Sequence, residues 1–208
     1  MGTQPREGYF KFTALFAGIG HADPADVAAL NRWRTRLRAL DMIGAYREGV
    51  LAGVGFGNLS IRISDGFLIT ATRTGQVAEL TAREYCMVSH CDLERNQVLY
   101  RAEEGSVSPS AECMTHAVLY QVDCGIGAVI HVHHAGLWNR LMDRWPTTSR
   151  SVEYGTPQMG YELARLYRES DLLRLKVAVM GGHEDGVIAF GRDLDEAGAS
   201  LLDVYGVR

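Results

Sequence analysis

Charge of one sign, long apolar runs and paired cysteines are all scarce in this sequence. The formal net charge is only −4 at pH 7, so no strongly basic surface is available for nucleic acid. The longest uncharged apolar runs, such as 125–132, fall far short of the roughly 20 residues that a membrane-spanning helix needs. Residues 1–7 carry charge and a proline, and no apolar core of a signal peptide follows them. We therefore expect neither nucleic acid nor a membrane as a partner.

The cysteines do not form a recognisable framework. None of the four belongs to a C-x-x-C pair, and their spacing gives no sign of a disulfide network. We expect reduced, mostly buried thiols in a cytoplasmic protein. The four are Cys86, Cys91, Cys113 and Cys124.

The chain does have enough apolar sequence for one core. Hydrophobic residues make up 47% and charged residues 22% of the 208 residues, which is ordinary for a globular protein and excludes disorder over the whole chain. Residues 1–23 are rich in glycine and show little periodicity, so we expect an N-terminal extension on the surface. Residues 24–208 then form a single domain.

Hydrophobic periodicity predicts both helices and strands. From residue 24, apolar residues recur at three- and four-residue steps, which predicts an amphipathic helix that runs to Tyr46. The period then changes around Ser64-Asp65-Gly66, which indicates a hairpin. We expect strands at 59–63, 67–70, 87–93, 97–101, 125–133, 175–180 and 187–190, and further helices at 111–121, 135–142, 161–167 and 193–205. Hairpin-joined strands favour a largely antiparallel or mixed sheet, so the fold class is a single α/β domain of the α+β type.

Two histidines end the most strand-like segment of the chain. His131 and His133 are two residues apart, and side chains at that spacing on a strand point to the same face. Neutral imidazole is a good ligand for zinc and similar divalent metals. His183, in a glycine-rich loop between two predicted strands, can supply a third ligand, and three histidines with one open position are typical of a catalytic metal site. His134 has the wrong parity to join them, so we expect it at the surface or behind the site.

A carboxylate and a set of small polar segments complete the candidate site. Glu112 falls at the start of a predicted helix, where the helix dipole favours a negative charge, and it can move a proton beside a metal. His116 follows one turn later and is expected to be a positioning or core residue. The segments 55–60 and 72–75 supply backbone N–H groups and polar side chains, as does Ser110, which together suggest a phosphate or carboxylate subsite. Arg73 can add a charge-assisted bond to the same anion.

Taken in order, these segments resemble the class II aldolase/adducin family over residues 25–205. The resemblance implies a central, mostly antiparallel sheet between helix layers. For members similar to fuculose-phosphate aldolase, it also implies a homotetramer with active sites between subunits and a role in carbohydrate metabolism. The ordered set comprises Gly57-Asn58-Leu59-Ser60, Thr74-Gly75, Pro109-Ser110-Ala111-Glu112 with His116, His131-Val132-His133, His183, Gly191 and Glu196-Ala197.

The resemblance also implies roles for individual residues. The metal ligands are His131, His133 and His183, and the metal is zinc, with manganese, cobalt or nickel as alternatives. Glu112 is the general acid/base, and a tyrosine near the C-terminus, Tyr205, is a candidate second proton donor. The positions that match the family's phosphate cradle are Asn58, Thr74, Gly75 and Ser110.

The implied activity is that of a metal-dependent lyase. It would cleave a carbon–carbon bond of a small hydroxy-carbonyl or sugar-phosphate substrate through a metal-stabilised enediolate. Two departures bear on this. Ala111 stands where the family often has a serine that contacts phosphate. Glu184-Asp185 follow His183 where a glycine is usual, as if two residues were inserted, which can shift the third ligand or let either acid enter the metal shell. A decarboxylase, a dehydratase or a non-catalytic adducin-like binding module are the alternatives.

Overall fold

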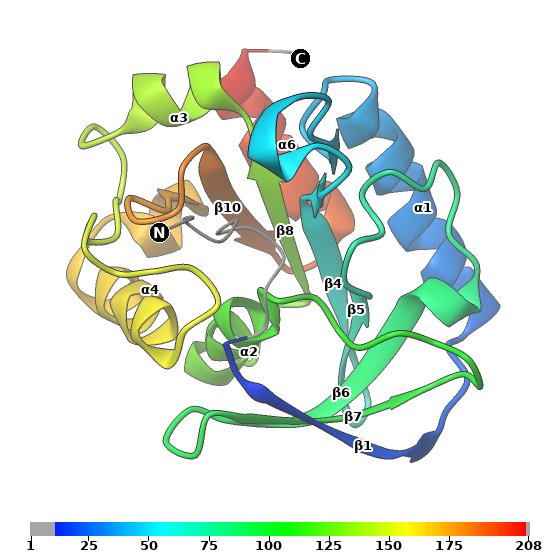
Figure 1. The fold of residues 1–208 in the computed structure, drawn as a ribbon. Coiled ribbons are helices and arrows are strands. Elements are labelled where there is room, and N and C mark those ends of the chain that lie inside the picture. The colour runs from blue at the N-terminus through cyan, green and yellow to red at the C-terminus, as the bar shows by residue number, and fades with distance from the viewer. Residues whose placement is uncertain (1–10, 207–208) are drawn as a thin grey trace.

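An eight-stranded sheet runs through the protein, in a computed structural model that describes residues 11–206 (Figure 1). The strand order is β1-β7-β6-β5-β4-β8-β10-β9. All neighbouring pairs are antiparallel except β1 with β7, which confirms the mostly antiparallel sheet. The strands are β1 (Thr13–Ile19), β4 (Asn58–Ile63), β5 (Gly66–Thr70), β6 (Tyr85–Asp92), β7 (Gln97–Ala102), β8 (Ala128–His133), β9 (Val177–Val179) and β10 (Gly186–Gly191). The expectation about residues 1–7 lies outside the described residues.

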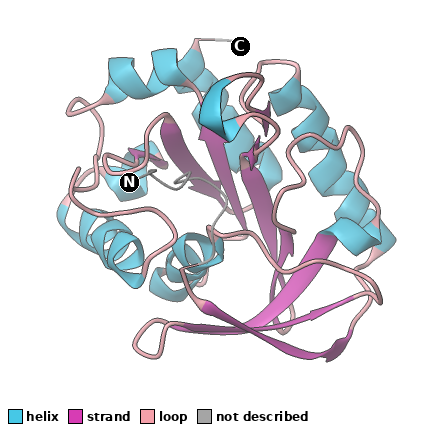
Figure 2. Ribbon diagram, in the orientation of Figure 1, coloured by secondary structure: helices cyan, strands magenta, loops and turns pink. Residues whose placement is uncertain are grey.

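Helices cover both faces of this sheet (Figure 2). One layer contains α2 and α4, whose apolar residues Met114, Leu119 and Leu163 join the first buried cluster with the sheet. The opposite layer contains α1 and α6, whose Leu30 and Leu201 join the second cluster. The helices are α1 (Pro24–Arg38), α2 (Cys113–Val122), α3 (Ala135–Leu141), α4 (Pro157–Glu169), α5 (Leu172–Leu175) and α6 (Leu194–Tyr205).

The helix predicted to reach Tyr46 ends earlier, and that prediction is wrong. α1 stops at Arg38, because Asp41 takes a left-handed conformation with φ of 53° and the chain turns back. The backbone oxygen of Met42 then accepts a hydrogen bond of 3.0 Å from His133 N. Just beyond, β2 (Gly44–Ala45) pairs with β3 (Gly55–Phe56). These long-range backbone bonds outweigh the local helical pattern.

Two other segments differ from the sequence expectation. Residues 13–19, expected within a surface extension, form edge strand β1, which extends the sheet beyond β7. The strand predicted at 175–180 is only Val177–Val179, because α5 occupies the preceding residues and Lys176 has a positive φ of 58°. The remaining strands and helices lie within a few residues of their predicted positions.

Strand β8 positions the site. It lies between β4 and β10, and its register places His131 opposite Asn58 and His133 opposite Gly186. The end of β8 therefore meets the start of β4 and the loop that precedes β10. Ala128, Ile130 and Val132 point into the second core cluster and anchor the strand from its other face, as its alternation predicts.

Candidate metal centre

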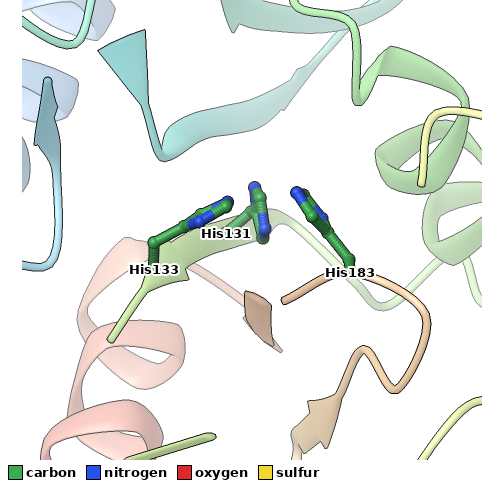
Figure 3. Close-up of side chains that lie close together, drawn as sticks. All are labelled: His131, His133 and His183. Atoms are coloured by element: carbon green, nitrogen blue, oxygen red, sulfur yellow. The ribbon is translucent and has the colours of Figure 1, made fainter. Parts of the chain in front are cut away.

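Three imidazole rings converge at the end of β8 (Figure 3). His131 and His133 come from the strand and His183 from the loop before β10. One nitrogen of each ring lies within 4.8 Å of the other two. The rings of His133 and His183 are 4.6 Å apart between centroids, and each lies 5.0 Å from the ring of His131. All three side chains are buried, with exposed fractions of 4% or less.

Backbone contacts in the 181–186 loop aim His183 at the strand. His183 N donates to Met180 O over 3.1 Å, and Gly186 N donates back to His183 O over 3.0 Å. The preceding Gly182 is packed so closely that a Cβ there would lie 1.9 Å from Val152 O. Glycine is therefore required at this position for the loop to enter the site. The tight loop brings a third ligand to a strand that lies about fifty residues earlier in the chain.

Hydrogen bonds orient two of the rings. Tyr46 Oη lies 3.0 Å from His133 Nδ1, and the side-chain amide of Asn58 lies 3.2 Å from His131 Nδ1. The Asn58 atom that faces this ring nitrogen is Nδ2, while Oδ1 is buried without a hydrogen-bond partner among the described residues. Turning the amide over would let Oδ1 accept from Nδ1–H and leave the Nε2 of His131 with its lone pair. This Nε2 is buried and has no hydrogen-bond partner within residues 11–206. Such a second contact is what fixes the orientation of a metal-ligating histidine.

The electrostatics of the cluster keep His131 neutral. Burial, and then the neighbouring imidazoles His133, His183 and His116, lower the pKa of His131 well below 6.5. Neutral imidazole is the ligand form. The donor set, its spacing and the buried His131 Nε2, which has no hydrogen-bond partner in residues 11–206, therefore fit a divalent metal ion. Neither Glu184 nor Asp185 belongs to this group of ligand-type side chains in the described residues.

Glu112 stands immediately beside the histidines. It is the N-cap residue of α2, rather than a first-turn residue, and its side chain is only 4% exposed. Its Oε2 accepts a hydrogen bond of 2.8 Å from Thr115 Oγ1, and its Oε1 lies 3.5 Å from His183 Nδ1. The positive end of α2 favours the ionised carboxylate at this point. A carboxylate and a candidate metal site therefore share one buried region.

His116 belongs to the core behind the site. Its Nδ1 lies 2.7 Å from Ser60 Oγ, which in turn lies 2.7 Å from Tyr120 Oη. Burial lowers the pKa of His116 to about 3, so the ring is neutral at physiological pH. Of the two roles that the sequence left open, this favours the core role.

The small polar segments that the sequence predicts to bind an anion, at 55–60, 72–75 and Ser110, meet around one small pocket next to Glu112. Three stretches far apart in the sequence line it, together with the ring of Tyr154. A larger cavity of about 510 Å³ adjoins His183 and is lined by Tyr46 and the same Tyr154. This volume suits a small ligand. The residues of the three stretches that the sequence singled out are Asn58, Arg73, Thr74, Gly75 and Ser110.

Two tyrosines contact the clustered histidines, and neither of them is Tyr205, the tyrosine that the resemblance implies. The ring of Tyr154 stacks on His183 with centroids 4.4 Å apart, and Tyr46 bonds to His133. The ring of Tyr205 packs edge-on against His134 instead, at 5.1 Å. Tyr154 lies in no periodic or motif segment, so only the folded chain reveals it. His134 itself caps α3 by accepting a hydrogen bond from Leu137 N.

None of the helices within residues 11–206 is long and apolar enough to cross a membrane. The cysteines are all free thiols; Cys86, Cys91 and Cys113 are buried and Cys124 is exposed. This confirms the expectation of mostly buried cysteines.

Solved structures share this fold. L-fuculose-1-phosphate aldolase from Thermus thermophilus superposes with a TM-score of 0.58 at 20% identity, over 88% of this chain and 87% of its own. A sugar-phosphate aldolase from Thermotoga maritima gives 0.64 at 16% identity, over 86% of this chain and 90% of its own. YgbL from Escherichia coli, for which aldolase, epimerase and decarboxylase activities are named as candidates, gives 0.60 at 17%, over 86% and 84%.

At these identities the likeness establishes a common fold and not a common reaction. The sequence itself identifies the family. Residues 44–204 match the family model described as "Class II Aldolase and Adducin N-terminal domain", which covers most of the chain and all of the site described above. The chain therefore belongs to the class II aldolase and adducin N-terminal domain family.

Proposed function

We propose that this protein is a metal-dependent lyase that cleaves a carbon–carbon bond in a small hydroxy-carbonyl or sugar-phosphate substrate. The observation that carries the proposal is the buried Glu112 carboxylate beside three converging histidines. An adducin-like binding module has no need of a buried carboxylate at a metal site. Family membership and the aldolases among the solved structures of the same fold support the proposal.

Each group has a part in this chemistry. His131, His133 and His183 would hold the metal, with zinc the first choice and manganese, cobalt or nickel the alternatives. A bound divalent cation supplies a Lewis acid that stabilises negative charge on the substrate oxygens during bond cleavage. Glu112 would donate or remove the proton at the substrate carbon whose carbon–carbon bond is cleaved, because its Oε1 lies 3.5 Å from His183 Nδ1 at the edge of the cluster.

The other end of the substrate would sit in the small pocket. Asn58, Thr74, Gly75 and Ser110 line it, and we assign them to a phosphate or carboxylate group of the substrate. The N-terminus of α2 adjoins the same pocket and adds a favourable field for an anion. Because Ala111 stands where the family often has a serine, a carboxylate remains an alternative to phosphate.

In the cleavage direction a second group must accept the proton of the hydroxyl that becomes the aldehyde oxygen, and the same group is the proton donor in the reverse, condensation direction. Tyr205 was implied by the family resemblance, whereas Tyr154 is the tyrosine stacked on His183 in this chain. The variants Tyr205→Phe and Tyr154→Phe separate the two candidates. Loss of kcat by about 10²-fold or more is expected for the donor, and the other variant should retain turnover, as measured with a substrate that wild-type protein cleaves.

The reaction type is tested by product analysis. Zinc-loaded protein is incubated with a panel of sugar phosphates and hydroxy acids, and the products are identified by mass spectrometry. An aldehyde and a ketone fragment support the lyase. Carbon dioxide or loss of water supports a decarboxylase or a dehydratase that uses the same residues. Failure to take up any metal supports a non-catalytic binding module.

The assembly and location belong to the proposal as well. We propose a homotetramer with active sites between subunits, as in members similar to fuculose-phosphate aldolase. Light scattering checks it, since a monomeric mass in solution would contradict it. The free thiols support a cytoplasmic location with a role in carbohydrate metabolism.

A further inference from the structure

A buried arginine lies directly behind the small pocket. Arg34, on α1, is only 1% exposed. Its Nη2 donates to Thr74 O over 2.9 Å and to Val77 O over 3.1 Å, while Nη1 lies 3.5 Å from Ala78 O. In Figure 1 the loop that follows β5 passes along α1, and these bonds hold it there. All of these acceptors are backbone oxygens of that loop.

This charge has no acidic partner at ion-pair distance among the described residues. Burial lowers the pKa of Arg34, and the charge of Glu84 is close enough to oppose that shift. However, the Glu84 carboxylate accepts its hydrogen bonds from the backbone N–H and the hydroxyl of Thr81. A buried guanidinium compensated only by carbonyl dipoles is costly, and a nearby anion relieves that cost. The small pocket proposed above for the substrate anion is lined by Thr74 and Gly75 of the same loop, on the side opposite Arg34.

The geometry of the peptide bond connects the arginine to the pocket. In a trans peptide the C=O and N–H point in opposite directions. Thr74 O faces Arg34, so the N–H of Gly75 points away from the guanidinium. Likewise Gly75 O accepts a bond from Arg38, one turn after Arg34 on α1. Two successive peptides therefore turn their carbonyls to cations and their N–H groups away from them.

The Gly75 N–H remains available on the pocket side. It has no hydrogen-bond partner within residues 11–206, and Gly75 lines the pocket. A Cβ on the neighbouring Gly55 would lie 2.8 Å from this nitrogen, so glycine there leaves it uncovered. The Thr74 hydroxyl already donates to Ala71 O, and the loop must therefore offer an anion its backbone N–H groups.

We propose that Arg34 is a positioning residue for the substrate anion: its buried guanidinium, acting through the Thr74–Gly75 peptide, makes the pocket bind phosphate-type anions. Arg38 assists through Gly75 O. The inference rests on the proposed anion pocket, but it adds a residue that never touches the substrate. The exposed Arg73 at the rim is not the main source of positive potential, because its charge is screened by solvent.

The experiment compares Arg34→Met with a matched control. Arg62 also donates to three backbone oxygens, those of Tyr120, Asp123 and Ile126, but at the far end of α2. Purified, zinc-loaded full chains are titrated with inorganic phosphate by calorimetry, and Tm and zinc content are measured for each. We expect Arg34→Met to weaken phosphate binding by about tenfold and Arg38→Met by a few-fold. Arg62→Met should keep the wild-type Kd even where its Tm falls equally.

Conservative substitution separates charge from structure. Arg34→Lys retains a cation but loses the planar set of N–H donors that reaches three carbonyls, so its phosphate affinity should lie between that of wild type and that of Arg34→Met. The proposal is overturned when folded Arg34→Met binds phosphate like wild type, or when Arg34→Lys loses as much affinity as Arg34→Met. Should Arg34→Met fail to fold, an unchanged Kd in Arg38→Met overturns it. Wild-type protein that binds no phosphate contradicts the anion pocket itself, which is a different result.

Discussion

The Nδ1 atom of His183 lies 3.5 Å from Oε1 of Glu112, with both side chains 4% exposed or less. One residue comes from the tight loop before β10 and the other from the start of α2. Their contact places a carboxylate at the edge of the three-histidine cluster. A base held this close to a metal site can act on the same substrate atoms that the metal binds.

Replacing Glu112 with glutamine tests this arrangement. Glu112→Gln keeps the size and the Thr115 contact but removes the base, so kcat should fall by about 10²–10⁴-fold. Because the histidines are unchanged, zinc content measured by elemental analysis should remain near that of wild type. The control is Glu162→Gln, whose carboxylate bonds to Ser149 N and Arg165 near the surface. Unchanged turnover in Glu112→Gln would remove Glu112 from the mechanism.

Metal binding should depend on the buried histidines and not on their neighbour. His131→Ala removes one of three ligands, and we expect zinc affinity to fall by at least about 10-fold with complete loss of turnover. His134→Ala is the matched control, since His134 follows the pair directly but caps α3. It should bind zinc normally. Competition with a chromophoric chelator measures both affinities, and equal values for the two variants would contradict the cluster.

Tyr46 should act through His133. Its hydroxyl lies 3.0 Å from the Nδ1 of that ring, and contacts of this kind orient metal ligands. Tyr46→Phe removes only the hydroxyl, and zinc affinity should fall by about 10–100-fold. Excess zinc should then restore most of the turnover. A variant that binds zinc as tightly as wild type would show that the hydroxyl does not orient the ligand.

The buried His116 makes stability depend on pH. Its pKa is about 3 in the folded chain and about 6.5 when unfolded, so the unfolded state binds more protons between these values. Stability is therefore fully present above pH 6.5 and is lost as the pH falls toward 3. Between pH 8 and pH 5 this histidine alone accounts for about 2 kcal/mol.

Urea denaturation of metal-free protein at the two pH values measures that loss. His116→Gln cannot titrate, so its free energy of unfolding should fall by about 2 kcal/mol less than that of wild type over the same range. The titration of His131 is common to both proteins and cancels in the comparison. Equal losses in the two proteins would show that His116 is not buried in its neutral form.

Some residues of the candidate site could be predicted from the sequence and others could not. The parity of β8 alone places His131 and His133 together, since alternation along a strand is a local property. The position of Glu112 at a helix start is local in the same way. Tyr46 and Tyr154 could not be predicted, because each reaches its histidine through chain reversals that no periodicity encodes. Arg34 carried no signal either, since it is one of four arginines at alternate positions of α1, and nothing in the sequence distinguishes it from its solvated neighbours until the loop covers it.

Local patterning thus determined most strands and helices and the pair of histidines on β8. The tertiary structure decided where α1 ends, because the pairing of residues 42–45 with distant strands competes with helix propensity. It also decided which glycine loop delivers His183 and which arginine lies behind the pocket. Contacts of this kind depend on the closing of long loops and on packing between layers, and their energies are absent from any short stretch of sequence.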